Sequence, residues 1–129
     1  MVTKILLDSD ILIDYLRIKT GPLPSFLDLQ KNGEAKLFIS AVSIMEIFTG
    51  KSAGEIADEL ESFITSFQVV SFDKEIARFA GEIERNHKLK LPVSDFIIGV
   101  TSLRLKAQLA TRNKKHFQGI PGLKFFSPS

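Results

Sequence analysis

The sequence contains no cysteine and no tryptophan, and its uninterrupted apolar runs are only a few residues long. The absence of cysteine excludes a disulfide scaffold, a cysteine-ligated zinc finger and a cysteine nucleophile, and it is compatible with a reducing cytoplasm. Runs this short cannot span a bilayer, which takes about 20 apolar residues. The segment Lys4–Leu7 is followed at once by Asp8, unlike a signal peptide. We therefore expect a soluble, cytoplasmic protein.

The composition is that of an ordinary globular domain. The chain has 129 residues, of which 44% are hydrophobic and 25% are charged, and these values exclude collagen-like, mucin-like and disordered chains. A chain of this length is close to the commonest domain size. No repeat, low-complexity tract or linker interrupts it, so we predict a single domain over residues 1–129.

Acidic residues are scarce in the last third of the chain. The whole sequence has 17 basic and 15 acidic residues, but the segment Arg85–Ser129 has nine basic residues and one acid, Asp95. This asymmetry has two readings, a lysine-solvated surface or a basic surface for a phosphate-bearing partner. The isolated carboxylate of Asp95, within the apolar stretch Val93–Ile98, calls for a specific role.

Short apolar segments alternate with amphipathic ones along the chain. The expected strands are Lys4–Leu7, Leu37–Ile39, Val69–Val70, Ala107–Thr111 and Leu123–Phe126. The expected helices run from Ser9 or Asp10 through Leu16, from Ser25 to Lys31, from Ser40 or Ser43 through Phe48, from Ala53 to Phe67, from Asp73 through Ile83, and from Ser94 to about Lys106. Such alternation predicts an α/β fold, a three-layer α/β/α sandwich with a short-stranded, mainly parallel central sheet.

Three acids stand where such a sheet binds its ligands, beyond the carboxyl ends of the strands or at the start of a helix. Asp8 follows the first expected strand, Glu46 follows the second, and Asp95 opens the last helix. Each also has a purely structural explanation: Asp8 could cap a helix, Ser43 and Glu46 have capping-box spacing, and Asp95 could stabilise a helix dipole. Burial among apolar neighbours favours a functional role for Glu46 and Asp95.

A convergence of these three carboxylates would favour a hard cation. Oxygen ligands without histidine or cysteine suit Mg²⁺ or Mn²⁺. Such an ion can bind a phosphodiester and lower the pKa of an attacking water. We therefore expect a Mg²⁺ (or Mn²⁺) site formed by Asp8, Glu46 and Asp95.

A polar, basic loop follows the fourth expected strand, at the same edge of the sheet. Its basic residues are Arg112, Lys114 and Lys115, and they serve either phosphate contact or simple solvation. The two histidines of the chain, His87 and His116, are more commonly surface or packing residues than ligands.

At these residues the sequence resembles a PIN domain, and more narrowly a VapC-type toxin of prokaryotic toxin–antitoxin pairs. The resemblance spans nearly the whole chain in the expected order. The motifs that carry it are Leu6–Asp14, Ser40–Ile47 followed by Gly50, Ile76–Ala77 with Ala80–Ile83, Leu91–Ile98, Leu109–Phe117 and Ile120–Leu123.

The resemblance implies a metal-dependent endoribonuclease with Asp8, Glu46 and Asp95 as its catalytic, metal-binding acids. It makes Ser9 a supporting hydroxyl near the metal and gives Thr111 a similar part. Arg112, Lys114 and Lys115 would contact the RNA backbone. Relatives usually dimerise, and a small antitoxin protein covers their acidic site. The eleven phenylalanines of this chain also favour a homodimer, because we expect part of that apolar surface outside the monomer core.

One departure from the family pattern lies in the basic loop. Many relatives carry a fourth acid there, whereas this chain has Asn113 and His116 and no carboxylate after Asp95. Asn113 can offer an oxygen or orient a water but brings no charge. This favours one alternative, a catalytically weak PIN-like module that binds RNA or a protein. A phospho-acceptor domain using Asp73 ranks last, since the acid pair and the lysine it needs are not clearly present.

Overall fold

The computed structural model describes residues 1–127; the last two residues of the predicted domain, 128–129, lie outside that range. The strands are β1 (Thr3–Leu7), β2 (Ala35–Ser40), β3 (Gln68–Val70), β4 (Gln108–Ala110) and β5 (Lys124–Phe125). The helices are α1 (Ser9–Ile18), α2 (Leu23–Lys31), α3 (Ala41–Phe48), α4 (Ala57–Ile64), α5 (Lys74–His87), α6 (Val93–Leu105) and the 3₁₀ helix η1 (Lys114–Phe117).

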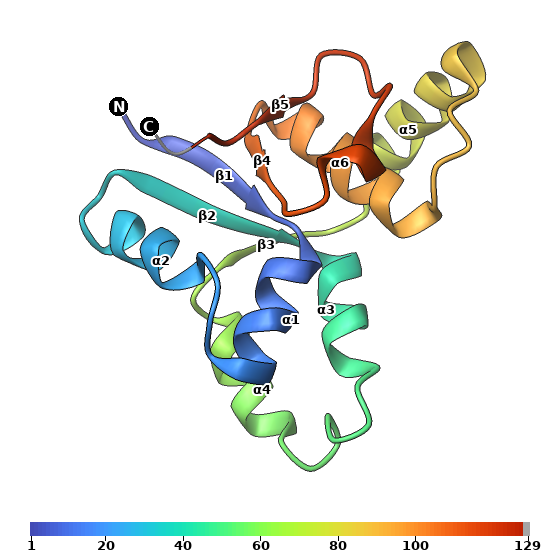
Figure 1. Ribbon diagram of the computed structural model, residues 1–129. Coiled ribbons are helices and arrows are strands. Elements are labelled where there is room, and N and C mark those ends of the chain that lie inside the picture. The colour runs from blue at the N-terminus through green and yellow to red at the C-terminus, as the bar shows by residue number, and fades with distance from the viewer. Residues whose placement is uncertain (128–129) are drawn as a thin grey trace.

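The five strands form one parallel sheet in the order β3-β2-β1-β4-β5. Strand β1 is central, and it pairs with β2 through Ile5–Leu37 and with β4 through Leu6–Leu109. Because the strands are parallel, their carboxyl ends meet at one edge of the sheet. Figure 1 shows this edge where β1 turns into α1 and β2 into α3.

Alternate residues of the central strand serve two separate cores. Ile5 and Leu7 pack with α1, α2, α3 and α4 on one face of the sheet. Leu6, together with Phe38, packs on the opposite face with α6, which a third cluster joins to α5. Figure 1 shows the two groups of helices on opposite sides of the sheet. The predicted three-layer α/β/α sandwich with a parallel sheet is confirmed.

The predicted helix starts are partly confirmed. Helix α1 is capped by Asp8, as the structural explanation of that residue proposes, and not by Ser9 or Asp10. Helix α3 is capped by Ser40, one of its two predicted starts. Ser43 therefore lies inside the helix, and the capping-box reading of Ser43 with Glu46 is wrong. Helix α6 begins at Val93 after Pro92 with no side-chain cap, so Ser94 lies within its first turn.

Two further helix boundaries differ from the expectation. Pro24 lies in the first turn of α2 and does not precede the helix, a position where proline loses no intrahelical hydrogen bond. Helix α4 is shorter than the predicted Ala53–Phe67, because residues 51–56 form turns, for example through the hydrogen bond from Ala53 N to the Gly50 carbonyl. No helix within residues 1–127 is long and apolar enough to cross a membrane.

Gly99 lets the segment after β4 pack closely on α6. A Cβ at this position would lie 2.5 Å from Ile120 Cδ1 and 3.2 Å from Phe117 Cδ1. Phe117 is 1% exposed, so its ring is fixed in this contact and holds η1 against the helix. Gly81 on α5 offers a comparison, because a Cβ there would meet nothing within 4 Å.

We predict opposite effects of alanine at these two helical glycines. Gly81→Ala should stabilise the fold by about 0.5–1 kcal/mol, because alanine restricts the unfolded chain. Gly99→Ala restricts the unfolded chain in the same way. It should nevertheless destabilise the fold overall, because overpacking a core contact costs about 1–3 kcal/mol. Urea unfolding of the two variants and the wild type measures both changes. Equal stabilisation by the two substitutions would contradict close packing of η1 on α6.

Candidate functional site

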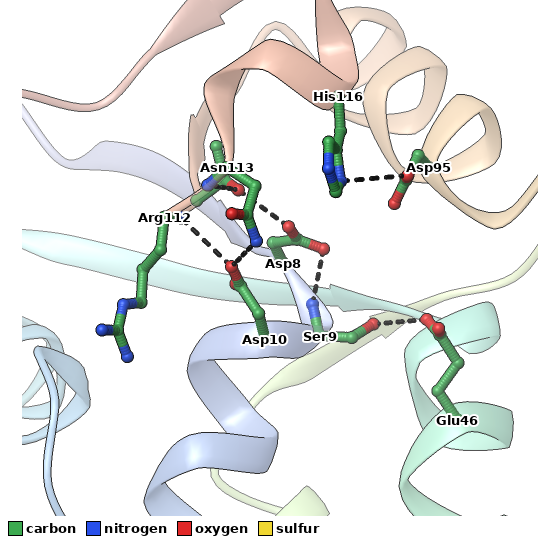
Figure 2. Close-up of polar contacts among 9 residues, drawn as sticks. Asp8, Ser9, Asp10, Glu46, Asp95, Arg112, Asn113 and His116 are labelled. Atoms are coloured by element: carbon green, nitrogen blue, oxygen red, sulfur yellow. Dashed lines mark hydrogen bonds and ion pairs between the residues drawn. The ribbon is translucent and has the colours of Figure 1, made fainter. Parts of the chain in front are cut away.

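Polar side chains from four segments meet at the carboxyl edge of the sheet (Figure 2). Asp8 follows β1 and caps α1. Glu46 lies on α3, which begins directly after β2, and Asp95 lies in the first turn of α6. Thr111 follows β4, next to β1 in the sheet. The parallel topology therefore gathers residues that are up to 103 positions apart.

Asp8 is the most deeply buried of the acids, with 5% of its surface exposed. Its Oδ1 accepts from the backbone N–H of Ser9 at 2.7 Å, and its Oδ2 accepts from the Thr111 hydroxyl at 2.8 Å. Burial raises the pKa of Asp8 to about 7, and the charges of Asp10 and Asp95 add to the rise although the two hydrogen bonds oppose it. Asp8 thus caps a helix as the structural explanation requires, and it also meets other negative charges.

The hydroxyl groups of Ser43 and Ser9 form a hydrogen-bonded chain that ends at Glu46. Ser9 Oγ lies 2.6 Å from Glu46 Oε1 and 2.7 Å from Ser43 Oγ. A carboxylate only accepts and a hydroxyl has one proton to give. Ser9 therefore donates to Glu46 and accepts from Ser43, whose side chain is fully buried. The sequence reasoning missed this role of Ser43, because the capping-box spacing explained it locally.

Asp10 also belongs to the acidic cluster, whereas the sequence analysis proposed it only as a possible start of the first helix. Its Oδ2 accepts from Asn113 Nδ2 at 2.9 Å and from the backbone N–H of Arg112 at 3.3 Å. Its Oδ1 is buried and has no hydrogen-bond partner within residues 1–127. Burial raises the pKa of Asp10, and the charge of Asp14 contributes. The signal for this role was the second acid in Asp8-Ser9-Asp10, one more than capping needs.

The loop after β4 is attached to α1 by its first residues. Thr111 Oγ1 donates to Asp8 and accepts from the backbone N–H of Asn113 at 3.0 Å. The guanidinium of Arg112 forms an ion pair with Asp14, and Figure 2 shows it pointing away from Asp8. Arg112 is thus engaged in holding the loop. Lys114 and Lys115 are exposed, and Lys114 Nζ lies 5.6 Å from the centre of the Phe125 ring.

Asp95 faces η1 across the site. Its Oδ2 lies 3.5 Å from His116 Nδ1, and the side chains of Asp95 and His116 are 20% and 58% exposed. The charge of Asp95 contributes to the raised pKa of Asp8. Its direct contact is with His116 (Figure 2).

The three predicted metal-binding acids are therefore neighbours but not a closed set. Glu46 is reached from Asp8 through Ser9, and Asp95 acts on Asp8 electrostatically. Within residues 1–127 no group of three or more His, Cys, Asp or Glu side chains could hold a metal ion. The expected tight convergence of three like charges is thus not seen.

The donor chemistry nevertheless fits a hard divalent cation. Mg²⁺ in proteins is usually held by one or two carboxylates, with water and substrate phosphates completing its shell. Asp8 supplies a buried carboxylate whose pKa is raised by burial and other acids, and Asp10 supplies a buried oxygen without a donor. A cation would relieve both unfavourable features.

Comparison with known proteins gives the same assignment along nearly the whole chain. The model of the PIN domain family matches residues 5–123. Ribonuclease VapC10 of Mycobacterium tuberculosis is 33% identical over 123 residues, which are 93% of this chain and 90% of that protein. Ribonuclease VapC1 of Methanocaldococcus jannaschii is 31% identical over 129 residues, 96% of this chain and 88% of that protein.

The fold is also that of a chain in a solved complex. The structure of VapBC2 from Rickettsia felis, bound to a DNA fragment from its promoter, contains a chain that matches with a TM-score of 0.80. The match covers 98% of this chain and 100% of that one at 20% identity. The chain described here therefore belongs to the PIN-domain family, with VapC-type ribonucleases as its relatives.

Proposed function

We propose that this protein is a metal-dependent endoribonuclease that hydrolyses RNA phosphodiester bonds and acts as the toxin of a toxin–antitoxin pair. The observation that carries the proposal is the buried Asp8 carboxylate, whose pKa is raised to about 7 at an edge shared with Asp10 and Asp95. A protein keeps such an arrangement at a functional site more often than elsewhere. The names of the relatives, VapC ribonucleases, support the substrate.

Asp8, Glu46 and Asp95 would hold the cation, Mg²⁺ or Mn²⁺. Bound there, the ion would lower the pKa of a water and offset the negative charge that develops on the phosphodiester. The protein's part is to keep the carboxylates in place. Thr111 and the Ser9 N–H hold the two oxygens of Asp8. Ser43 and Ser9 fix the direction from which Glu46 receives its hydrogen bond.

The loop after β4 would receive the RNA backbone. Asn113 donates to Asp10 and so holds the loop near the acids. Arg112 is paired with Asp14, so its main role would be to attach the loop to α1. Lys114 and Lys115 are exposed on η1 beside this edge, and they are the residues we expect to contact phosphate groups.

A groove of about 490 Å³ between α1, α3 and the segment before α4 suits a partner peptide. Its wall is largely apolar, including Ile13, Leu16 and Ile47, and Glu46 also lines it. A peptide lying there would touch an acid of the site. Because matching solved structures are toxin–antitoxin complexes, we assign this groove to a small antitoxin.

We also propose that the chain forms a homodimer. Of the eleven phenylalanines, only Phe72 is strongly exposed within residues 1–127, at 45%. Most of the phenylalanine surface is therefore used inside the monomer, and the expectation that it lies outside the core is wrong. Met45 at 58% and Val93 at 73% add exposed apolar surface, and such surface is typical of contact regions when it is contiguous.

A catalytically weak RNA- or protein-binding module is the second candidate. The absence of a closed three-residue metal group within residues 1–127 favours it, as does His116 in the loop where many relatives have an acid. It predicts RNA binding without cleavage.

We predict that RNA cleavage requires Mg²⁺ or Mn²⁺ and stops in EDTA. Asp8→Asn and Asp95→Asn should each lower the cleavage rate by roughly 10²–10³-fold, the loss typical of removing one charge-stabilising group. Asp28→Asn, an exposed acid on α2, is the matched control and should cleave normally. The assay is gel analysis of a labelled RNA. Undiminished cleavage in excess EDTA would exclude the mechanism, and binding without cleavage would favour the weak module.

We predict that the metal-free protein loses stability as pH rises. The pKa of Asp8 is about 7 in the folded protein against an ordinary 3.8, so between about pH 4 and 7 the folded state holds a proton that the unfolded chain has released. The folded state therefore becomes less stable through this window, by on the order of a few kcal/mol, and the loss is constant above it.

Asp8→Asn removes this pH dependence but keeps the helix cap, because asparagine caps about as well as aspartate. Its advantage over the wild type in melting temperature should grow from pH 4 to 7 and then level off. Added Mg²⁺ should recover about 2.7 kcal/mol in the wild type at a hundred times its dissociation constant, and much less in the variant. Thermal melts with and without metal measure both. An advantage independent of pH would contradict the raised pKa.

We predict a steep salt dependence of RNA binding that depends on η1. Each single-strand phosphate contact should contribute about 0.7 to the slope of log affinity against log salt. Changing Lys114 and Lys115 together to glutamine should flatten the slope by that amount per lost contact. The same change at Lys31 and Lys74, exposed on α2 and α5, is the control. Fluorescence anisotropy in EDTA, where RNA stays intact, gives the slopes; equal slopes for the two double variants would exclude this RNA face.

A further inference from the structure

The loop between α5 and α6, residues 88–92, places a second pair of lysines beside η1. Leu89 of this loop packs against the segment after η1, where a Cβ added at Gly119 would lie 2.8 Å from Leu89 Cδ2. Leu89 also packs on the apolar cluster that contains Phe117 of η1. Figure 1 shows both segments next to α6 on the same side of the sheet. The α5–α6 loop and the η1 segment therefore lie against each other.

Lys88 and Lys90, on either side of Leu89, are exposed and held in fixed backbone conformations. Both are left-handed, with φ of 48° and 54°, a conformation that lysine adopts less readily than glycine or asparagine. Lys88 caps the end of α5, where a positive charge suits the helix dipole, but Lys90 lies beyond the helix. The Lys90 N–H donates to both carboxylate oxygens of Glu84, at 3.3 Å each. Helix α5 thus holds the loop in this shape.

The positive charges on these two segments have no counter-charge. Within residues 1–127 no ion pair includes any of their four lysines, which are Lys88, Lys90, Lys114 and Lys115. The carboxylate of Glu84 accepts from a backbone N–H. Asp95, the only acid after that residue, pairs with His116. An uncompensated surface of one sign attracts a polyanion.

We propose that the α5–α6 loop is a second RNA-backbone contact, so that one single strand runs from the acidic edge over η1 and on to Lys88 and Lys90. The inference rests on the proposed function. Both segments border the first turn of α6, because His116 of η1 lies 3.5 Å from Asp95 and the loop continues directly into that turn. Lysine contacts of this kind bind phosphate groups and position the strand without reading its bases.

The test is RNA binding by the full-length protein in EDTA, measured by fluorescence anisotropy. The probes are unstructured RNAs of about 4 and about 16 nucleotides, the range of single-strand site sizes. The variant combines Lys88→Gln with Lys90→Gln. Its matched control combines Lys19→Gln with Lys106→Gln, because these lysines are also exposed and left-handed, with φ of 55° and 57°. They cap the far ends of α1 and α6, two helices that begin at the acidic edge.

With the longer RNA, the variant at Lys88 and Lys90 should lower the slope of log affinity against log salt by about 1.4, for two contacts of about 0.7 each. The affinity advantage of the wild type should therefore shrink roughly sevenfold between about 50 and 200 mM salt. The short RNA cannot cover both lysine pairs at once. The steepening of the slope from the short to the long RNA should thus be smaller by about 1.4 in this variant, and unchanged in the control. Circular dichroism melts check that both variants are folded.

The outcomes separate this inference from the proposed function. Equal slopes for the variant and its control on the longer RNA would overturn the second contact, and cleavage by the wild type in Mg²⁺ or Mn²⁺ would leave the nuclease proposal standing. A loss of equal size on both RNAs would overturn the continuous path. The expected slopes without any cleavage in Mg²⁺ or Mn²⁺ would support the path and overturn the nuclease. Failure of the wild type to bind RNA would overturn both.

Discussion

The Asp8 carboxylate is the interaction on which the site and its surroundings depend. It follows the central strand, accepts from the first N–H of α1 through one oxygen, and accepts from Thr111 after β4 through the other. A single side chain thus joins β1, β4 and α1. Because it is buried, both hydrogen bonds are stronger than they would be in water, and the loss of either would leave a buried oxygen unpaired. The backbone segments after β1 and β4 therefore hold this carboxylate in its buried position.

Burying Asp8 among other acids creates an electrostatic problem that the surrounding residues only partly solve. Asp10 receives Asn113 and the Arg112 N–H on one oxygen but nothing on the other within residues 1–127. The guanidinium of Arg112 pairs with Asp14, one helical turn further from Asp8. The charge of Arg112, the residue after Thr111, is therefore used to hold the loop. A cation, alone or bound to a phosphate group, would neutralise the negative charge that remains.

The sequence predicted the scaffold well because the relevant signals are local. Apolar runs such as Ile5–Leu7 identify the strands, and parallel topology then brings residues after different strands to one edge. Local signals failed where a side chain has a distant partner. Ser43 looked like a cap because Glu46 is three residues away, whereas its partner Ser9 is 34 residues away. Asp10 looked like a cap because its partners lie on the loop 102 and 103 positions later.

The site differs in rigidity from one side to the other, and this bears on its chemistry. Ser43, Ser9 and Asp8 are each at most 5% exposed, so the Asp8–Glu46 side is held by a buried network with few alternatives. Asp95 and His116 lie on the open side, with His116 more than half exposed. In the proposed nuclease, the buried side would determine where the cation lies, and the open side would admit a large polyanionic substrate.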